Sequence, residues 1–173
     1  MSNYDEDASI VNDLLDLEIL IVRPVAQVWK QWLDLSSWVI SHDIEQVEGE
    51  RDEVGGITRV SDRCSKEVGY PTPHYHYCKV IELIPQRRYV LKSYTEKGGS
   101  YGLQFIGFDE ARFHIVDRDS TKVHFRFLGE TRGMATLIVE HPAKLTEVGS
   151  DNHMWRNLEN LKRIVESQPR TAE

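Results

Sequence analysis

The chain has none of the long apolar segments that mark membrane proteins or exported precursors. No apolar run approaches the ~18 residues that a membrane-spanning helix needs. The first residues include Asp5, Glu6 and Asp7, and they lack the basic start and apolar centre of a signal peptide. We therefore expect a cytoplasmic protein that does not insert into a membrane.

Cysteine and clustered basic charge are also scarce. Cys64 and Cys78 are the only cysteines, and in a chain without an export signal we expect two reduced thiols rather than a disulfide. The formal net charge is -7, and the Lys and Arg residues are scattered rather than gathered into a stripe. A nucleic-acid partner is not expected, because binding to a phosphate backbone needs such a stripe.

Sequence motifs for common catalytic sites are missing as well. The Gly98-Gly99 pair is not followed by a Lys-Ser/Thr sequence and a helix, so it predicts a hairpin turn and not a phosphate loop. No serine has the surroundings of a nucleophile elbow, and no triad is apparent. There is no repeat or low-complexity stretch, and we expect no cofactor.

An amphipathic pattern occupies the C-terminal end of the chain. From Asp151 to Ser167, the apolar residues Met154, Leu158, Leu161 and Val165 recur at spacings of 4, 3 and 4, which places them on one face of a helix. Ser150 or Asp151 can cap this helix, and Pro169 lies just past its end. The apolar stripe needs a sheet to bury it, and a sheet that curves around the helix would leave a ligand cavity between them.

The preceding part of the chain predicts such a sheet. Leu17–Val22 is expected to be a strand, Pro24 to begin a helix with Val25, Val28, Trp29 and Trp32, and Asp34–Ser37 to cap a second short helix with Trp38 and Ile40. Seven further strands are expected at Ile44–Glu48, Ile57–Cys64, His74–Ile84, Tyr89–Thr95, Tyr101–Phe108, Arg112–Asp117 and Lys122–Gly129. Short turns between them favour antiparallel pairing, and Ala135–Val139 is a further, ambiguous candidate.

We expect one domain. The composition, 40% hydrophobic and 28% charged, is that of an ordinary globular protein. Residues 1–12 are polar and acidic and predict a disordered tail, which leaves residues 13–173 for the domain.

Four segments resemble the SRPBCC/START/Bet v 1-like helix-grip superfamily. ILIVRPVAQVWKQW at Ile19–Trp32 is similar to its strand, Pro and Val-Trp helix, and GGIT at Gly55–Thr58 to its glycine turn. KVIELIPQRRY at Lys79–Tyr89 resembles its strand with a Pro-containing turn, and MWRNLENLKRIVE at Met154–Glu166 resembles its C-terminal helix. Within this superfamily, the chain resembles the polyketide cyclase/dehydrase-like or the Hsp90-activator-like branch.

The resemblance implies an α+β helix-grip fold. A curved antiparallel sheet of about seven strands would surround the long C-terminal helix, with two short helices after the first strand. In most branches the cavity between sheet and helix holds an apolar ligand. The superfamily has no single catalytic signature, so no catalytic residue can be carried over to this chain.

The strand at 74–78 has an unusual run of rings, HYHYC. Alternation places His74, His76 and Cys78 on one face and Tyr75 and Tyr77 on the other. The resemblance favours Tyr75 and Tyr77 as the inward, catalytic pair, while a bulge would reverse the assignment and bring His74 and His76 inside. The spacing matches no familiar zinc motif, so we expect a solvent-facing histidine face and no metal.

Other side chains are candidates for the wall of the cavity. In the strands at 112–117 and 122–129, alternation favours buried aromatics, with His114, His124 and Arg126 in water; in the other orientation Arg126 would clamp a ligand carboxylate. The helix residues are first of all core, and a solvent-exposed Asn157 is as plausible as one that offers its amide to a ligand. The predicted ligand contacts are Trp38, Tyr101, Leu103, Arg126, Met154, Asn157, Leu158 and Leu161.

Three functions compete at this point. The first is a carrier or binding module for a polyketide-, aromatic- or sterol-like molecule, and the second is a cyclase, aromatase or dehydratase that uses acid–base residues. The third is a partner-binding domain of the Hsp90-activator-like kind, for which an exposed apolar patch would be expected. The density of rings between Tyr70 and Tyr77 favours a cyclase-like protein, which we expect to be a monomer or homodimer.

Overall fold

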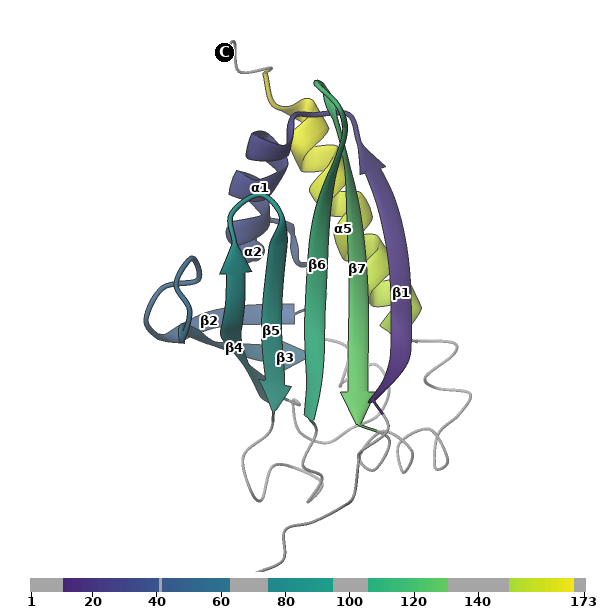
Figure 1. Cartoon of the computed structure of the whole chain (residues 1–173). Helices are drawn as coiled ribbons and strands as arrows, with labels where there is room; N and C mark the ends of the chain where they lie inside the picture. The colour runs from purple at the N-terminus through teal and green to yellow at the C-terminus, as the bar shows by residue number, and fades with distance from the viewer. Residues whose placement is uncertain (1–10, 41, 63–74, 95–105, 131–149, 170–173) are drawn as a thin grey trace, which may run out of the picture.

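A computed structural model describes residues 11–40, 42–62, 75–94, 106–130 and 150–169 (Figure 1). The strands are β1 (Val11–Ile21), β2 (His42–Glu48), β3 (Ile57–Asp62), β4 (Tyr75–Ile84), β5 (Arg88–Tyr94), β6 (Ile106–Asp117) and β7 (Ser120–Glu130). The helices are α1 (Val25–Leu33), α2 (Leu35–Trp38) and α5 (Ser150–Ser167).

The strands form one antiparallel sheet with the order β1-β7-β6-β5-β4-β3-β2. Short turns join β4 to β5 and β6 to β7, and a turn containing Gly55, with φ of 102°, joins β2 to β3. The expected glycine turn at Gly55-Gly56 is therefore confirmed. The sheet bends so that β2 and β3 run across the direction of the other strands, while α5 lies along β1 (Figure 1).

The core lies between the sheet and the helices. We call the sheet face that packs toward α1 and α5 the inner face; it carries Ile19, Val80, Tyr89, Phe113 and Phe125, and the opposite face is the outer face. On α5, Leu158, Leu161 and Val165 are 0% exposed. The amphipathic pattern predicted this stripe, and the expected curved sheet around a long C-terminal helix is confirmed.

Tryptophans of α1 and α2 fill one end of this core. Trp32 packs edge-on against Phe113 at 5.4 Å and lies 4.8 Å from Trp38, whose Nε1 donates a hydrogen bond to the Trp32 carbonyl over 3.1 Å. Trp29 packs on Phe113 and on Tyr89. This end of the molecule is closed by large interlocking rings.

Arg23, just before α1, and Gln27, within α1, hold the C-terminal end of α5. The Arg23 guanidinium donates to the carbonyls of Glu166 and Gln168, and the Gln27 amide donates to the carbonyl of Pro169. Carbonyls at and just past the end of a helix have no amide of a following turn to bond, so Arg23 and Gln27 satisfy them. The helix is thus fixed to the first helical segment at its C-terminal end.

Three sequence predictions about the elements need correction. Residues 101–108 and 112–117 were expected to be separate strands, but β6 runs without a break from Ile106 to Asp117, because pairing with β5 and β7 on both sides outweighs the weak strand propensity of Asp109-Glu110-Ala111. Strand β1 begins at Val11, inside the expected tail. The Asp34 side chain makes no capping bond to α2, and Ile40 lies beyond that helix.

Some expected features fall outside the described residues: most of the tail, the Gly98-Gly99 turn and Ala135–Val139. None of the helices in the described part of the chain is long and apolar enough to cross a membrane.

Candidate functional site

A bulge in β4 decides which side chains of the ring-rich strand face inward. Val80 pairs with Leu91 and Glu82 pairs with Val90, so Ile81 is an extra residue and the alternation shifts at that point. Cys78 and His76 therefore lie on the inner face with Val80, while Tyr75 and Tyr77 lie on the outer face. The expectation that the two tyrosines point inward is wrong, and the reversal by a bulge is what the structure has.

The tyrosines form a short row outside the sheet. Tyr77 stacks on Tyr94 at 5.7 Å and meets Tyr75 edge-on at 6.4 Å. Tyr75 is 45% exposed, and the Arg59 guanidinium lies 5.8 Å from its ring centre. These rings thus lie on the sheet face opposite to the one that packs toward α5.

Three polar side chains from neighbouring strands meet on the inner face instead. Ser93 of β5 lies opposite Cys78 of β4, and Asp109 of β6 is the next inner-face residue after Gly107, the partner of Ser93. The Ser93 hydroxyl donates to Asp109 Oδ2 over 2.5 Å. Because that hydroxyl has one hydrogen, the Cys78 thiol is the donor in its 3.4 Å contact with Ser93 Oγ. We call Cys78, Ser93 and Asp109 the inner polar row.

Burial sets the protonation of this row. Burial raises the pKa of Asp109 to about 6, although the hydrogen bond from Ser93 acts in the opposite direction. Burial, and secondly the charge of Asp109, raise the pKa of the Cys78 thiol far above its usual range. Asp109 is thus the group of the row that titrates near neutrality, and Cys78 stays a thiol.

Several inner-face residues around the row are not fully covered. Leu91, Asp109, Phe127 and Met154 keep intermediate exposure, unlike the sealed core at Leu158 and Leu161. Asp109 thus combines partial exposure with a desolvated carboxyl. Gly107 contributes to the shape here, because a Cβ at this position would lie 2.6 Å from Phe127 Cζ.

Further polar side chains continue across the inner face toward the sheet edge. Thr58 donates to Gln46 Oε1 over 3.2 Å, and the rings of His42 and His76 meet edge-on at 6.4 Å. Within the described residues, no three His, Cys, Asp or Glu side chains are grouped as metal ligands.

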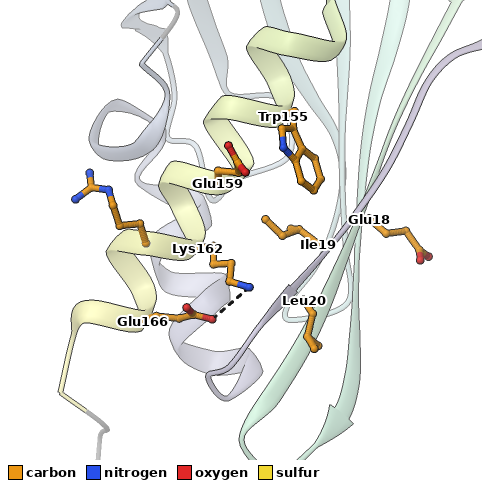
Figure 2. A pocket seen from close by; sticks show the side chains of 8 residues that line it. Glu18, Ile19, Leu20, Trp155, Glu159, Lys162 and Glu166 are labelled. Carbon is orange, nitrogen blue, oxygen red and sulfur yellow. Dashed lines mark ion pairs between the residues drawn. The ribbon is translucent and has the colours of Figure 1, made fainter.

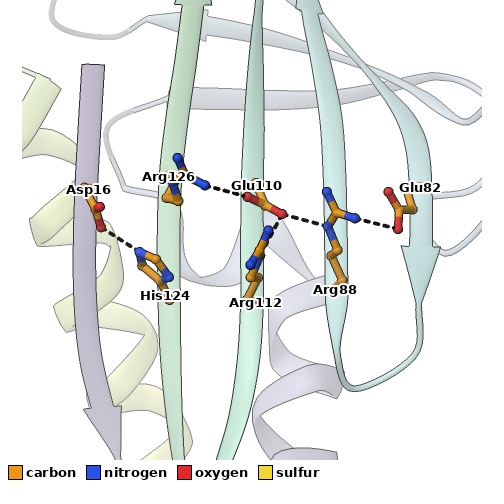
Figure 3. Close-up of polar contacts among 7 residues, drawn as sticks. All are labelled: Asp16, Glu82, Arg88, Glu110, Arg112, His124 and Arg126. Atoms are coloured by element: carbon orange, nitrogen blue, oxygen red, sulfur yellow. Dashed lines mark hydrogen bonds and ion pairs between the residues drawn. The ribbon is translucent and has the colours of Figure 1, made fainter. Parts of the chain in front are cut away.

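The outer face carries a chain of charges centred on Glu110 (Figure 3). Its carboxylate accepts from Arg88 Nε at 2.7 Å and Arg112 Nε at 2.8 Å, and Arg126 Nη1 lies 3.5 Å away. Burial alone would raise the pKa of Glu110, but Arg112 and then Arg88 outweigh it and lower that pKa. Arg126 therefore lies outside the interior. The prediction that it contacts a ligand there is wrong, because alternation in β7 turns Phe125 and Phe127 to the inner face instead.

The other residues that the sequence predicts as ligand contacts lie mainly in the core. Trp38 is 1% exposed in the core, and Asn157 is 2% exposed with its Oδ1 accepting from the Ile40 amide over 3.0 Å. Leu158 and Leu161 are core residues without accessible surface, and Met154 borders the core with intermediate exposure. His74, Tyr101 and Leu103 lie outside the described residues.

A groove of about 530 Å³ also runs between α5 and β1 on the molecular surface (Figure 2). It is lined by Glu18, Ile19, Leu20, Trp155, Glu159, Lys162, Arg163 and Glu166. Five of these eight residues are charged, and Lys162 pairs with Glu166 at 3.9 Å. The inner face, which is more apolar than this charged groove, suits an apolar ligand better.

Comparison with solved structures identifies the fold. The ZhuI aromatase/cyclase from Streptomyces sp. R1128 superimposes with a TM-score of 0.68 over 91% of this chain and 95% of its own, at 12% identity. The chain has the helix-grip fold.

Other helix-grip proteins superimpose as widely. Norcoclaurine synthase from Thalictrum flavum, solved with a transition-state analogue, gives a TM-score of 0.66 over 92% of this chain and 97% of its own, at 14% identity. Ara h 8.0201 gives 0.63 over 91% and 99%, at 16% identity. Neither a protein-family model nor a curated protein matches the chain. At these identities the helix-grip likeness establishes the fold alone.

Sequence reasoning missed Ser93 and Asp109. The signal was present, since alternation from Phe113 through Ala111 leads to Asp109, and alternation from Tyr89 through Leu91 leads to Ser93. It was lost because the strand at 106–117 was divided between Phe108 and Arg112, which removed Asp109 from any face.

Proposed function

We propose that the protein binds an aromatic or polycyclic apolar small molecule between the inner face of the sheet and α5. The observation that carries the proposal is the partial exposure of Leu91, Asp109 and Phe127 on the inner face and of Met154 on α5, beside the sealed core at Leu158 and Leu161. An apolar wall with one titratable group and a few hydrogen-bonding groups suits a ligand of this kind. The helix-grip fold is shared with an aromatase/cyclase and with norcoclaurine synthase.

Titration with a fluorescent naphthyl ligand tests this proposal. Leu91→Trp adds a ring on the inner face and is expected to weaken binding at least about tenfold by filling the space. Ile81→Trp adds the same ring at the exposed bulge of β4 and serves as the matched control. The proposal fails if the parent protein binds no apolar ligand, or if both variants bind like the parent. Separately, native mass spectrometry of protein purified from its own host would identify a co-purified molecule.

A second candidate function is a cyclase- or dehydratase-type reaction without a cofactor, and the position of Asp109 favours it. An ionised Asp109 would take a proton from the carbon beside a ligand carbonyl, and the C–H electron pair would form an enolate. The enolate would then expel a β-hydroxyl group, which takes the same proton and leaves as water. A group with a pKa near 6 suits both transfers.

Deuterium exchange tests this second candidate without the natural substrate. An aryl methyl ketone such as acetonaphthone is incubated with the protein in D2O, and methyl deuteration is followed by NMR. Exchange that Asp109→Asn abolishes would support an acid–base role. Binding without exchange would favour a carrier.

The remaining parts of the proposal come from the sequence. The net charge of -7 without a basic stripe supports a protein with no nucleic-acid partner. A cytoplasmic location and a monomeric or homodimeric state complete the proposal; size-exclusion chromatography with light scattering would measure that state.

A further inference from the structure

Asp109 is an acid on the inner face that has no counter-charge among the described residues. In the part of the chain that the structure describes, its carboxylate accepts one hydrogen bond, from Ser93 over 2.5 Å, and makes no ion pair. A desolvated carboxylate is costly unless a cation or a proton accompanies it. With its pKa near 6, Asp109 is mostly ionised at neutral pH and so carries that cost there.

The guanidinium groups of Arg112 on the same strand and of Arg88 and Arg126 on the neighbouring strands cannot supply the charge. Arg88 and Arg112 contact Glu110 on the outer face, and Arg126 lies 3.5 Å from the same carboxylate (Figure 3). Successive residues of a strand point to opposite faces, so these three cations and the Asp109 carboxyl are separated by the sheet.

The side chains next to Asp109 offer hydroxyl, thiol and apolar contacts. Ser93 and Cys78 complete the inner polar row, and Leu91, Phe127 and Met154 contribute partly exposed apolar surface to the same face or to α5. A cation that pairs with Asp109 would therefore meet an apolar and aromatic surface immediately beside its charge.

We infer that the ligand carries a protonated nitrogen, which pairs with the Asp109 carboxylate while its aromatic or apolar body lies against Leu91 and Phe127. The inference rests on the proposed function and names the ligand class, an amphiphilic amine. The pair would form away from bulk water, where a charge-assisted hydrogen bond is strong. An uncharged ligand of the same shape would leave the carboxylate unpaired.

The pairing predicts a definite pH dependence. The amine should bind tightly at a pH above the pKa of Asp109. It should lose affinity as the pH falls toward 5, because protonation of the carboxyl removes its charge. Among the side chains that the structure describes, the other titratable groups on the inner face are Cys78, Tyr89, His42 and His76. Helices α1 and α5 present Trp29, Met154 and Leu158 to this face. An uncharged probe measured over the same pH range reports any contribution of those groups.

Two probes that differ only in charge test the inference: 2-(1-naphthyl)ethylamine and 2-(1-naphthyl)ethanol. Calorimetric titration of the full chain at pH 7.5 is expected to show the amine binding at least about tenfold tighter than the alcohol. Asp109→Asn should abolish the preference, so that the amine binds no more tightly than the alcohol. Glu82→Gln, which makes the same carboxylate-to-amide change on the outer face, should keep the full preference.

Ser93→Ala provides a second variant that keeps the carboxylate. Loss of the hydroxyl donor should raise the pKa of Asp109 and so move the midpoint of amine binding to higher pH. Equal affinity of both probes for the parent overturns the amine inference and leaves the proposed apolar site intact. Binding of neither probe overturns both. A preference for the amine that survives Asp109→Asn also overturns the inference.

Discussion

Asp109 and Glu110 are adjacent acids whose carboxyl groups lie on opposite faces of the sheet and whose pKa values move in opposite directions. Asp109 faces inward, where burial raises its pKa to about 6. Glu110 is 3% exposed on the outer face, where Arg112 and Arg88 overcome the effect of burial and lower its pKa. Adjacent in sequence, Asp109 thus makes no ion pair with any residue that the structure describes, whereas Glu110 lies beside three arginines.

Asp109→Asn is expected to stabilise the folded protein at neutral pH. The pKa of Asp109 in the folded state lies above its ordinary value of 3.8, so the folded state keeps the proton to a higher pH than the unfolded state does. The free energy of unfolding therefore falls as the pH rises from about 4 to 6. Above pH 7 the variant should gain about 1 to 3 kcal/mol in free energy of unfolding, and the difference should vanish near pH 3. Urea denaturation of both proteins from pH 3 to 8 measures it; a constant difference would contradict the assignment.

Glu110→Gln is expected to have the opposite effect. Removal of the carboxylate leaves Arg88 and Arg112 without their buried partner and should destabilise the protein by about 2 kcal/mol at pH 7. Because the pKa of Glu110 is lowered, its contribution is present above about pH 4.5 and is lost as the pH falls through the folded pKa. Glu82→Gln, at the exposed end of the same network, should cost less than about 0.5 kcal/mol in parallel denaturation curves.

Gly107→Ala tests the close contact between β6 and the Phe127 ring. The added methyl carbon would lie 2.6 Å from Cζ, so the ring must move, at an expected cost of about 1 to 2 kcal/mol. Phe127→Leu added to the same chain should recover part of the lost Tm, because the shorter side chain clears the methyl group. Additive losses in the double variant would show that the two positions do not interact.

Asn157→Ala separates a structural role from a ligand-binding one. The side chain is buried, and its loss leaves the Ile40 amide without the acceptor it has at 3.0 Å, which should cost about 1 to 3 kcal/mol. Thermal denaturation measures the loss, and the naphthyl probes should bind the folded variant within about twofold of the parent. A large drop in affinity with unchanged Tm would instead favour the ligand contact that the sequence suggested.

Local patterns of the sequence account for much of the architecture. The spacing of Leu158, Leu161 and Val165 specified the buried face of α5, and Pro24 marked the start of α1 because its fixed φ suits a first helical turn. Turn residues such as Gly55 separated the strands well enough to predict antiparallel hairpins. These features depend on near neighbours along the chain, which is why the sequence alone determined them.

The faces of the central strands depended on the tertiary structure. Alternation read back from Leu83 would bring Tyr75 and Tyr77 inward, and the single extra residue at Ile81 brings His76 and Cys78 inward instead. A bulge arises from how two strands pair, and pairing partners are distant in sequence. Likewise, Asp109 and Glu110 have similar side chains. Their pKa values differ because of the packing around each one: Asp109 is desolvated on the inner face, whereas Glu110 lies beside arginines on the outer face.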